Sequence, residues 1–87
     1  MHLKEGFIVR NVADEYLLIP TGKNIASFGG SVILNEVSAF ILNQMKSDTT
    51  KEQLLEAILT EYDVSLELAT QDLDKLLTKL TQLGIIE

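Results

Sequence analysis

The hydrophobic pattern in the first quarter of the chain predicts two short strands. Residues 7–12 and 16–19 are apolar runs, and the connection of residues 13–15 between them is short enough for a hairpin. Pro20 lacks an amide donor and should end the second strand. Residues 21–24 then have the composition of a turn. We therefore expect an antiparallel pair of strands at the start of the chain.

Two further apolar runs flank a pair of glycines. Residues 25–28 and 31–34 are separated only by Gly29 and Gly30. A type I′ turn requires positive φ at both of its central positions, which glycine adopts without steric cost. We therefore predict a second, tighter hairpin, in which residues 25–28 pair with residues 31–34.

The remainder of the chain has the pattern of helices. From residue 35 to residue 83 there is neither glycine nor proline, and apolar residues recur three and four positions apart. Capping residues mark three helix starts: Asn35 for the first, Thr50 with Gln53 or Thr49 with Glu52 for the second, and Ser65 for the third. Gly84 fits the C′ position of the last helix and leaves Ile85 and Ile86 as an apolar tail.

Each predicted helix has an apolar face directed at a shared core. The inward residues are Val37, Phe40, Ile41 and Met45 in the first helix, Leu54, Leu55, Ile58, Leu59 and Tyr62 in the second, and Ala69, Leu73, Leu76, Leu77, Leu80 and Leu83 in the third. A β-rich first part followed by a helical second part predicts an α+β fold.

Length and composition narrow the class of protein. A chain of 87 residues should form one domain, residues 1–87. It contains no cysteine and no apolar run of the roughly 18 residues that a membrane span needs, and its N-terminus MHLKEG lacks the apolar region of a signal peptide. We therefore expect a cytoplasmic protein without a membrane partner.

The charge balance disfavours nucleic acid as a partner. Thirteen acidic residues against seven basic ones give a net charge of −6, and the lysines and arginine are scattered. Nucleic-acid binding draws much of its affinity from clustered cations that neutralise phosphates. An acidic surface instead favours a partner with basic patches.

The chain lacks the usual parts of an active site. His2 is the only histidine and lies at a terminus, where chains usually fray. Without cysteine or a second histidine, neither a nucleophile–base pair nor a transition-metal site can be assembled. Asp72 and Asp74 are two positions apart and should lie on different faces of a helix, so they do not suggest a metal pair. We expect no enzyme, no cofactor and no metal.

The predicted sheet has a consequence for binding. A short sheet leaves at least one edge of unpaired N–H and C=O groups, which attracts another strand. Peptides can bind by adding a strand to such an edge. The open sheet edge is therefore compatible with two kinds of protein, a peptide-binding module and a homodimerisation module. We expect the chain to be a monomer or a weak dimer.

Short motifs occur in a distinctive order along nearly the whole chain. They are Arg10 after the opening strand residues, the pair Leu34 and Asn35 entering a helix, a Thr-capped helix with Leu54, the link of Tyr62, Val64 and Ser65, Asp72 on the third helix, and a closing Leu80, Leu83, Gly84, Ile85 and Ile86. Together they resemble the PqqD-like peptide chaperones, also called RiPP precursor recognition elements.

This resemblance implies a winged-helix-like domain: a small antiparallel sheet of three to four short strands followed by three helices. Members bind the leader segment of a ribosomally made precursor peptide and present it to a modifying enzyme, often a radical SAM protein. The leader adds as a strand in the groove between the third strand and the third helix. Carried over by position, the peptide-binding residues are Ser31, Val32, Ile33 and Leu34 on the strand and Asp72, Lys75, Leu76 and Lys79 on the helix.

Two features of this chain bear on that interpretation. Compact members pass almost directly from the second strand to the docking strand, whereas residues 21–30 form a longer connection here. If residues 25–28 pair with the docking strand, only its other edge is open to a leader. A DNA-binding winged-helix regulator would share the helical arrangement but needs a basic recognition helix, and the third helix balances its charges: Glu67, Asp72 and Asp74 against Lys75 and Lys79.

Overall fold

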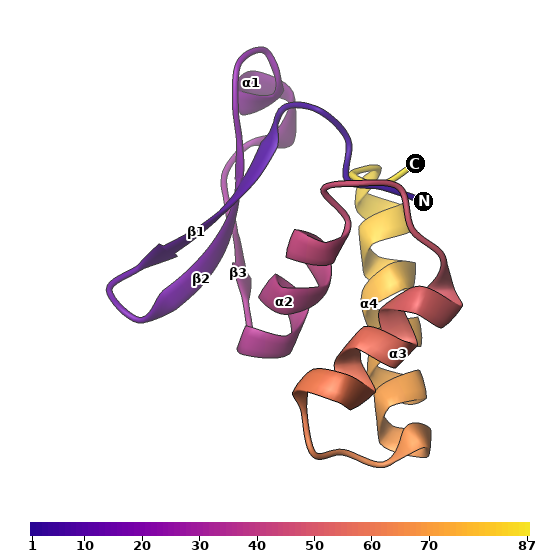
Figure 1. Cartoon of the computed structure of the whole chain (residues 1–87). Helices are drawn as coiled ribbons and strands as arrows, with labels where there is room; N and C mark the ends of the chain where they lie inside the picture. The colour runs from indigo at the N-terminus through magenta and orange to yellow at the C-terminus, as the bar shows by residue number, and fades with distance from the viewer.

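The computed structural model describes residues 1–87, apart from the side chain of Ser27. It contains a three-stranded antiparallel sheet, and the helices of the second half of the chain lie on one side of this sheet (Figure 1). The elements in chain order are β1 (Phe7–Val12), β2 (Glu15–Pro20), α1 (Asn24–Phe28), β3 (Val32–Leu34), α2 (Glu36–Gln44), α3 (Lys51–Glu61) and α4 (Leu66–Leu83). The predicted α+β, winged-helix-like fold is confirmed, with one additional helix, α1.

The first hairpin forms as predicted. β1 and β2 are antiparallel, with Val12 opposite Glu15. The two residues between them, Ala13 and Asp14, have φ values of 50° and 68°. Positive φ at both central positions is the requirement of a type I′ turn, whose twist matches that of the flanking strands. Ala13 adopts this conformation without being glycine, so the pairing of the strands must offset the cost.

The predicted second hairpin is wrong. Residues 25–28 belong to the short helix α1, and Gly29 ends it in the left-handed region with φ 79° and ψ 19°. The backbone N–H of Gly29 donates to the carbonyl of Ile25 at 3.3 Å. The first glycine of the pair therefore ends a helix, and β3 pairs instead with β2.

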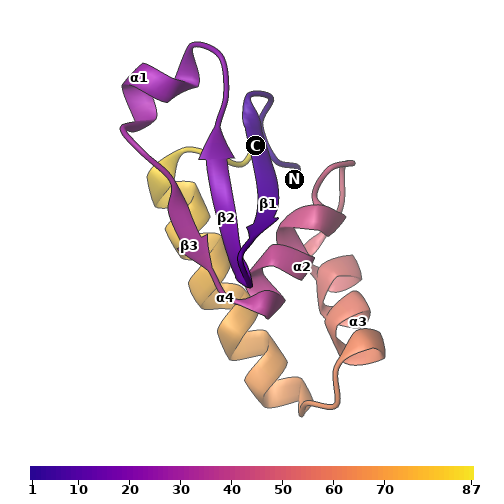
Figure 2. The same cartoon turned by 90° about the vertical axis from the view of Figure 1, so that its left-hand side faces the viewer.

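Contacts with β1 and the residues before it hold α1 in place. The Asn24 side-chain amide donates to the carbonyl oxygens of Glu5 and Gly6, both at 3.3 Å. The ring of Phe28 packs edge-on against Phe7, with centroids 5.2 Å apart. Figure 2 places α1 beyond the end of the sheet. In this position α1 does not pair with β3.

The predicted helix caps are confirmed. The Asn35 side chain accepts a hydrogen bond from the Ser38 N–H at 2.8 Å, and Ser65 accepts from the Leu68 N–H at 3.1 Å. For α3 the Thr50–Gln53 alternative is the one that forms, with both bonds of the capping box at 3.1 Å. Local hydrogen bonds thus set where each long helix begins.

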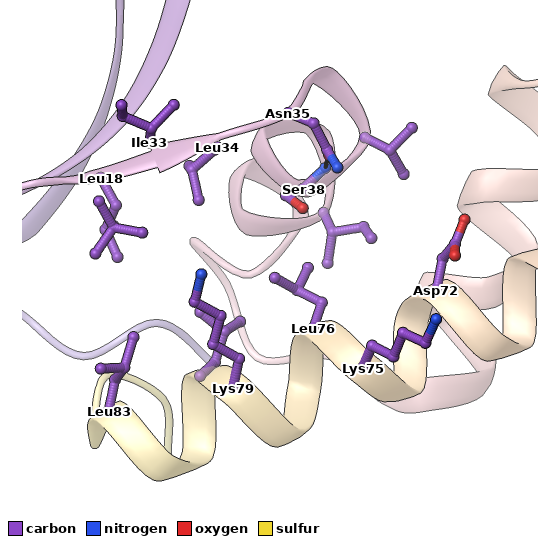
Figure 3. A pocket seen from close by; sticks show the side chains of 14 residues that line it. Leu18, Ile33, Leu34, Asn35, Ser38, Asp72, Lys75, Leu76, Lys79 and Leu83 are labelled. Carbon is purple, nitrogen blue, oxygen red and sulfur yellow. Dashed lines mark hydrogen bonds between the residues drawn. The ribbon is translucent and has the colours of Figure 1, made fainter.

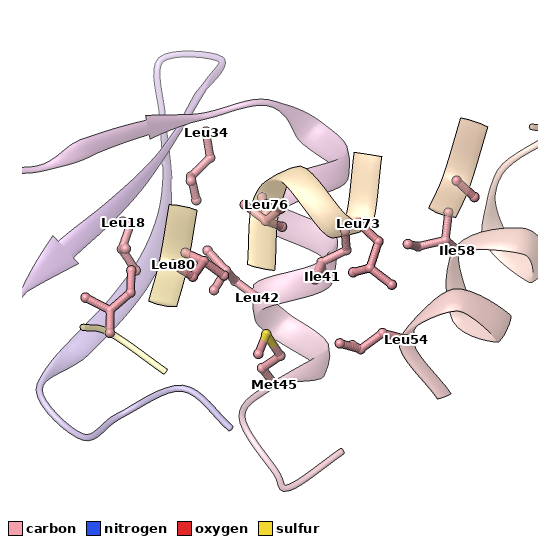
Figure 4. Packing of buried hydrophobic residues seen from close by; sticks show 13 residues of the cluster. Leu18, Leu34, Ile41, Leu42, Met45, Leu54, Ile58, Leu73, Leu76 and Leu80 are labelled. Carbon is pink, nitrogen blue, oxygen red and sulfur yellow. The ribbon is translucent and has the colours of Figure 1, made fainter. Parts of the chain in front are cut away.

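The core lies between the sheet and the helices (Figure 4). Its buried residues are Leu18, Leu34, Ala39, Ile41, Leu42, Met45, Leu54, Ile58, Ala69, Leu73, Leu76, Leu80 and Ile85. Two residues that were expected inside are instead exposed: Leu59 by 37% and Leu83 by 41%. Leu59 lies near the C-terminal end of α3, and Leu83 is the last residue of α4. Both are at helix ends, where neighbouring elements cover a side chain less completely.

The two chain ends lie together rather than fraying, which corrects the expectation for His2 (Figure 1). Leu3 and Ile86 form an antiparallel bridge, and the His2 N–H donates to the carbonyl of Glu87 at 2.7 Å. The His2 imidazole Nε2 lies 3.0 Å from the Glu87 carboxylate. The Met1 ammonium group donates to Asp48 at 2.7 Å and lowers the pKa of that carboxyl.

Candidate functional site

The outer edge of β3 is the first part of the candidate site. The strand order is β1-β2-β3, so β2 occupies one side of β3, and no strand of the described chain occupies the other. Such an edge presents N–H and C=O groups that a further strand can pair with. Residues 25–28 do not occupy it, so the predicted obstruction is absent.

A groove runs between β3 and α4, with a volume of about 330 Å³ (Figure 3). We call it the β3–α4 groove. Its lining residues are Leu18, Val32, Ile33, Leu34, Asn35, Val37, Ser38, Ile41, Asp72, Lys75, Leu76, Lys79, Leu80 and Leu83. This volume is at the lower end of the range for sites that bury a small ligand or a few peptide side chains.

The floor of the groove is apolar. Leu18, Ile41 and Leu80 are buried beneath it, with exposures of 0–1%. Leu76 extends from α4 toward β3, where Leu34 approaches it from above (Figure 3). Each of these two leucines keeps 9% of its surface exposed. An apolar side chain that enters the groove therefore meets a hydrophobic surface that is already formed.

Charged residues of α4 form one wall. Asp72, Lys75 and Lys79 are all exposed and line the groove, and their spacing of three and four residues keeps them on one helix face. Asp74 lies outside the groove and forms an ion pair with Lys51 of α3. The expectation that Asp72 and Asp74 face different directions is thus confirmed. Within the described residues, no group of three or more potential metal ligands is present.

The structure brings together all of the residues predicted from the strand and helix except Ser31. Val32, Ile33 and Leu34 line the groove from β3, although the Ile33 side chain is directed away from α4 (Figure 3), and the four predicted residues of α4 line it from the opposite side. Ser31 lies in an adjoining hollow with Gly29, Gly30, Gln82 and other residues. That hollow also includes Val32 and Leu83, so it continues the β3–α4 groove toward α1.

Sequence reasoning missed the residues that α2 contributes. Asn35, Val37 and Ser38 line the groove at the start of α2. They follow β3 directly in the chain, and this proximity was an available signal. Leu83 was also missed as a groove residue. It lies four positions after Lys79 and was predicted to be inside because of its place in the leucine stripe.

A short antiparallel sheet with an open edge, flanked by a helix across an apolar groove, defines a small winged-helix-like binding domain. The family model for coenzyme PQQ synthesis protein D (PqqD) matches residues 15–86, and the chain belongs to this family. The resemblance found in the sequence is thereby confirmed.

Two solved structures share the fold. TbiB1 in complex with the TbiA(beta) leader peptide superposes with a TM-score of 0.76 at 22% identity, covering 100% of this chain and 95% of that one. Lasso peptide synthetase B1 complexed with the leader peptide gives a TM-score of 0.73 at 21% identity, covering 99% and 95%. Comparison with curated proteins gives no match. Among the described helices, none combines the length and the apolar character that crossing a membrane requires.

Proposed function

We propose that this protein is a non-catalytic peptide chaperone, residues 1–87 forming one domain that binds the leader segment of a ribosomally made precursor peptide. The observation that carries the proposal is the open edge of β3 beside the β3–α4 groove. Membership of the PqqD family supports it. So does the fold shared with two proteins whose structures contain a leader peptide.

Binding would proceed by strand addition. The leader lies antiparallel or parallel to β3 and forms main-chain hydrogen bonds with its free edge, while alternate side chains enter the groove. Ordering an unstructured segment costs about 1–2 kcal/mol per residue in backbone entropy. Hydrogen bonds and apolar burial against Leu76 and Leu34 must exceed this cost. A dissociation constant of roughly micromolar magnitude is reasonable for such coupled ordering.

The biological consequence would be delivery of the precursor to a modifying enzyme in the cytoplasm, for which a radical SAM protein is the proposed class. Holding the leader raises the local concentration of the adjoining core peptide at the enzyme. This role requires neither a cofactor nor a chemical step in the present chain. A monomer suffices, because the groove is formed within one chain.

The proposal is tested by titrating isotope-labelled protein with the leader of the precursor encoded beside its gene. We expect backbone amide shifts concentrated in β3, the start of α2 and the groove face of α4. A scrambled leader of the same composition serves as the control. Shifts confined to residues outside these elements would rule out strand addition at β3. A concentration series by light scattering would show whether copies of the chain occupy the edge instead.

A further inference from the structure

Two lysines of the β3–α4 groove lack partners. Lys75 and Lys79 line the groove, and neither forms an ion pair with another described residue. Lys51 differs, since it pairs with Asp74 outside the groove. Both positive charges are therefore available to a ligand in the groove.

No acidic residue lies one helical turn before or after Lys79. Its helical neighbours at three and four positions are Lys75, Leu76, Gln82 and Leu83, with Thr78 and Leu80 adjacent in sequence. Lys75 and Lys79 are themselves four residues apart, a spacing at which like charges destabilise a helix. The only acid that lines the groove is Asp72, about two turns from Lys79.

The opposite wall does not supply the missing negative charge. The groove residues of β3 and α2 are all uncharged: Val32, Ile33, Leu34, Asn35, Val37, Ser38 and Ile41. Figure 3 shows the Lys79 side chain extending from α4 toward the space below β3. Because exposed charges are screened beyond about 8–10 Å, the net charge of −6 has less influence here than these nearby lysines. The groove is therefore locally positive at this end.

The spacing of the two lysines suits one side chain of an added strand. Four helical residues rise by about 6 Å along the axis. Successive same-face residues of a strand are about 6.6 Å apart. With both lysine side chains turned toward it, a carboxylate placed between Lys75 and Lys79 would contact both ammonium groups, and the next groove-facing residue of the strand would lie toward Leu83. This arrangement would also relieve the repulsion between the two lysines.

We propose that the β3–α4 groove selects an acidic peptide: an extended segment with Asp or Glu between Lys75 and Lys79 and an apolar residue two positions away. The inference rests on the proposed function and specifies its ligand. It reverses the expectation, drawn from net charge, of a partner with basic patches.

The test selects binders from a display library of random-sequence peptides, using the full chain as bait. Wild type should enrich peptides that carry Asp or Glu two positions from a large apolar residue. Lys79→Glu should instead enrich Lys or Arg at that position. Lys46→Glu makes the same change in net charge at an exposed position that does not line the groove, and it should select as wild type does.

Selected peptides then give the size of the effect. Replacing the peptide acid by its amide, or Lys79 by Gln, should weaken binding about twofold to fivefold, as for a partly exposed ion pair, and added salt should reduce the difference. Combining both changes should cost little more than either alone. Enrichment of neutral or basic peptides by wild type would overturn the inference.

The two proposals fail in distinguishable ways. If selected peptides perturb the amides of β3 but show no acidic preference, strand addition stands and the charge selection is wrong. If peptides perturb only other surfaces, or if none is enriched, the proposed function falls and the inference falls with it.

Discussion

Leu18 of β2 lies directly opposite Val32 of β3, and this pairing decides which edge of β3 remains open. Neighbouring strand residues alternate between the two faces of a sheet, so Leu18 and Val32 point together toward the core. The next pair, Leu17 and Ile33, points to the opposite face, where Ile33 is 68% exposed. With β2 on one side, the other edge of β3 can accept a peptide.

Proline substitutions in β3 should separate binding from folding. Along an antiparallel strand, the N–H groups point alternately to the two sides. Of Val32→Pro and Ile33→Pro, one therefore removes an N–H directed at the free edge and the other removes one directed at β2. We expect the first variant to lose leader affinity with a small change in melting temperature, and the second to melt at a markedly lower temperature. Calorimetric titration and thermal unfolding distinguish them; unchanged affinity in both variants would contradict strand addition.

Leu76→Ala should weaken peptide binding more than it weakens folding. Leu76 opens onto the β3–α4 groove, whereas Leu73, one turn earlier in α4, is fully buried outside the groove lining. Leu73→Ala, the control, should lower the free energy of unfolding by about 2–5 kcal/mol because it leaves a cavity. Leu76→Ala should cost less, since solvent and nearby side chains can fill the space. Denaturant unfolding and leader titration test both; a larger loss of affinity for Leu73→Ala would contradict the assigned groove floor.

Gly29→Ala should destabilise the protein through the end of α1. Gly29 has φ 79°, and a Cβ there would meet no atom within 4 Å, so the cost is conformational and not steric. We expect the free energy of unfolding to fall by about 1 kcal/mol. For Gly29→Asn the free energy of unfolding should fall by less, because Asn tolerates the left-handed region better than Ala does. Equal stability of all three proteins in urea would show that residue 29 is not held in this conformation.

Ionisation of Tyr62 should lower the free energy of unfolding at alkaline pH. Burial, followed by the nearby Glu36 carboxylate, raises the pKa of the Tyr62 phenol above 10.0. The folded state then retains the phenolic proton at pH values where the unfolded state has lost it, so the unfolded state binds fewer protons and stability falls as pH rises through and above about 10. The full contribution is present below the unfolded pKa.

Tyr62→Phe supplies the measurement. It keeps the edge-on ring contact with Phe40, whose centroid is 5.5 Å away in the wild type, and removes the titrating group. Urea unfolding at a series of alkaline pH values should therefore show a shallower decline for the variant, with tyrosinate absorbance following the ionisation directly. Parallel declines in the two proteins would contradict the raised pKa.

The sequence alone determined the first hairpin and the ends of the long helices, because these features depend on residues only a few positions apart in the chain. The first hairpin depends on a short connection between two apolar runs, and the long helices begin where Asn35, Thr50 and Ser65 can cap them. The αL conformation of Gly84 at the end of α4 is equally local. Helical spacing also placed Asp72, Lys75 and Lys79 on one face before any partner for that face was known.

Only the tertiary structure decided whether residues 25–28 form a strand or a helix, and which edge of the sheet lies opposite α4. A four-residue apolar run is compatible with a strand or a helix. Here distant contacts select the helix, because Asn24 bonds the carbonyl of Gly6 and Phe28 packs on Phe7. That choice leaves β3 to pair with β2 and keeps its other edge open beside Lys79. Local sequence cannot specify such an edge, since it depends on which segments meet after the chain has folded.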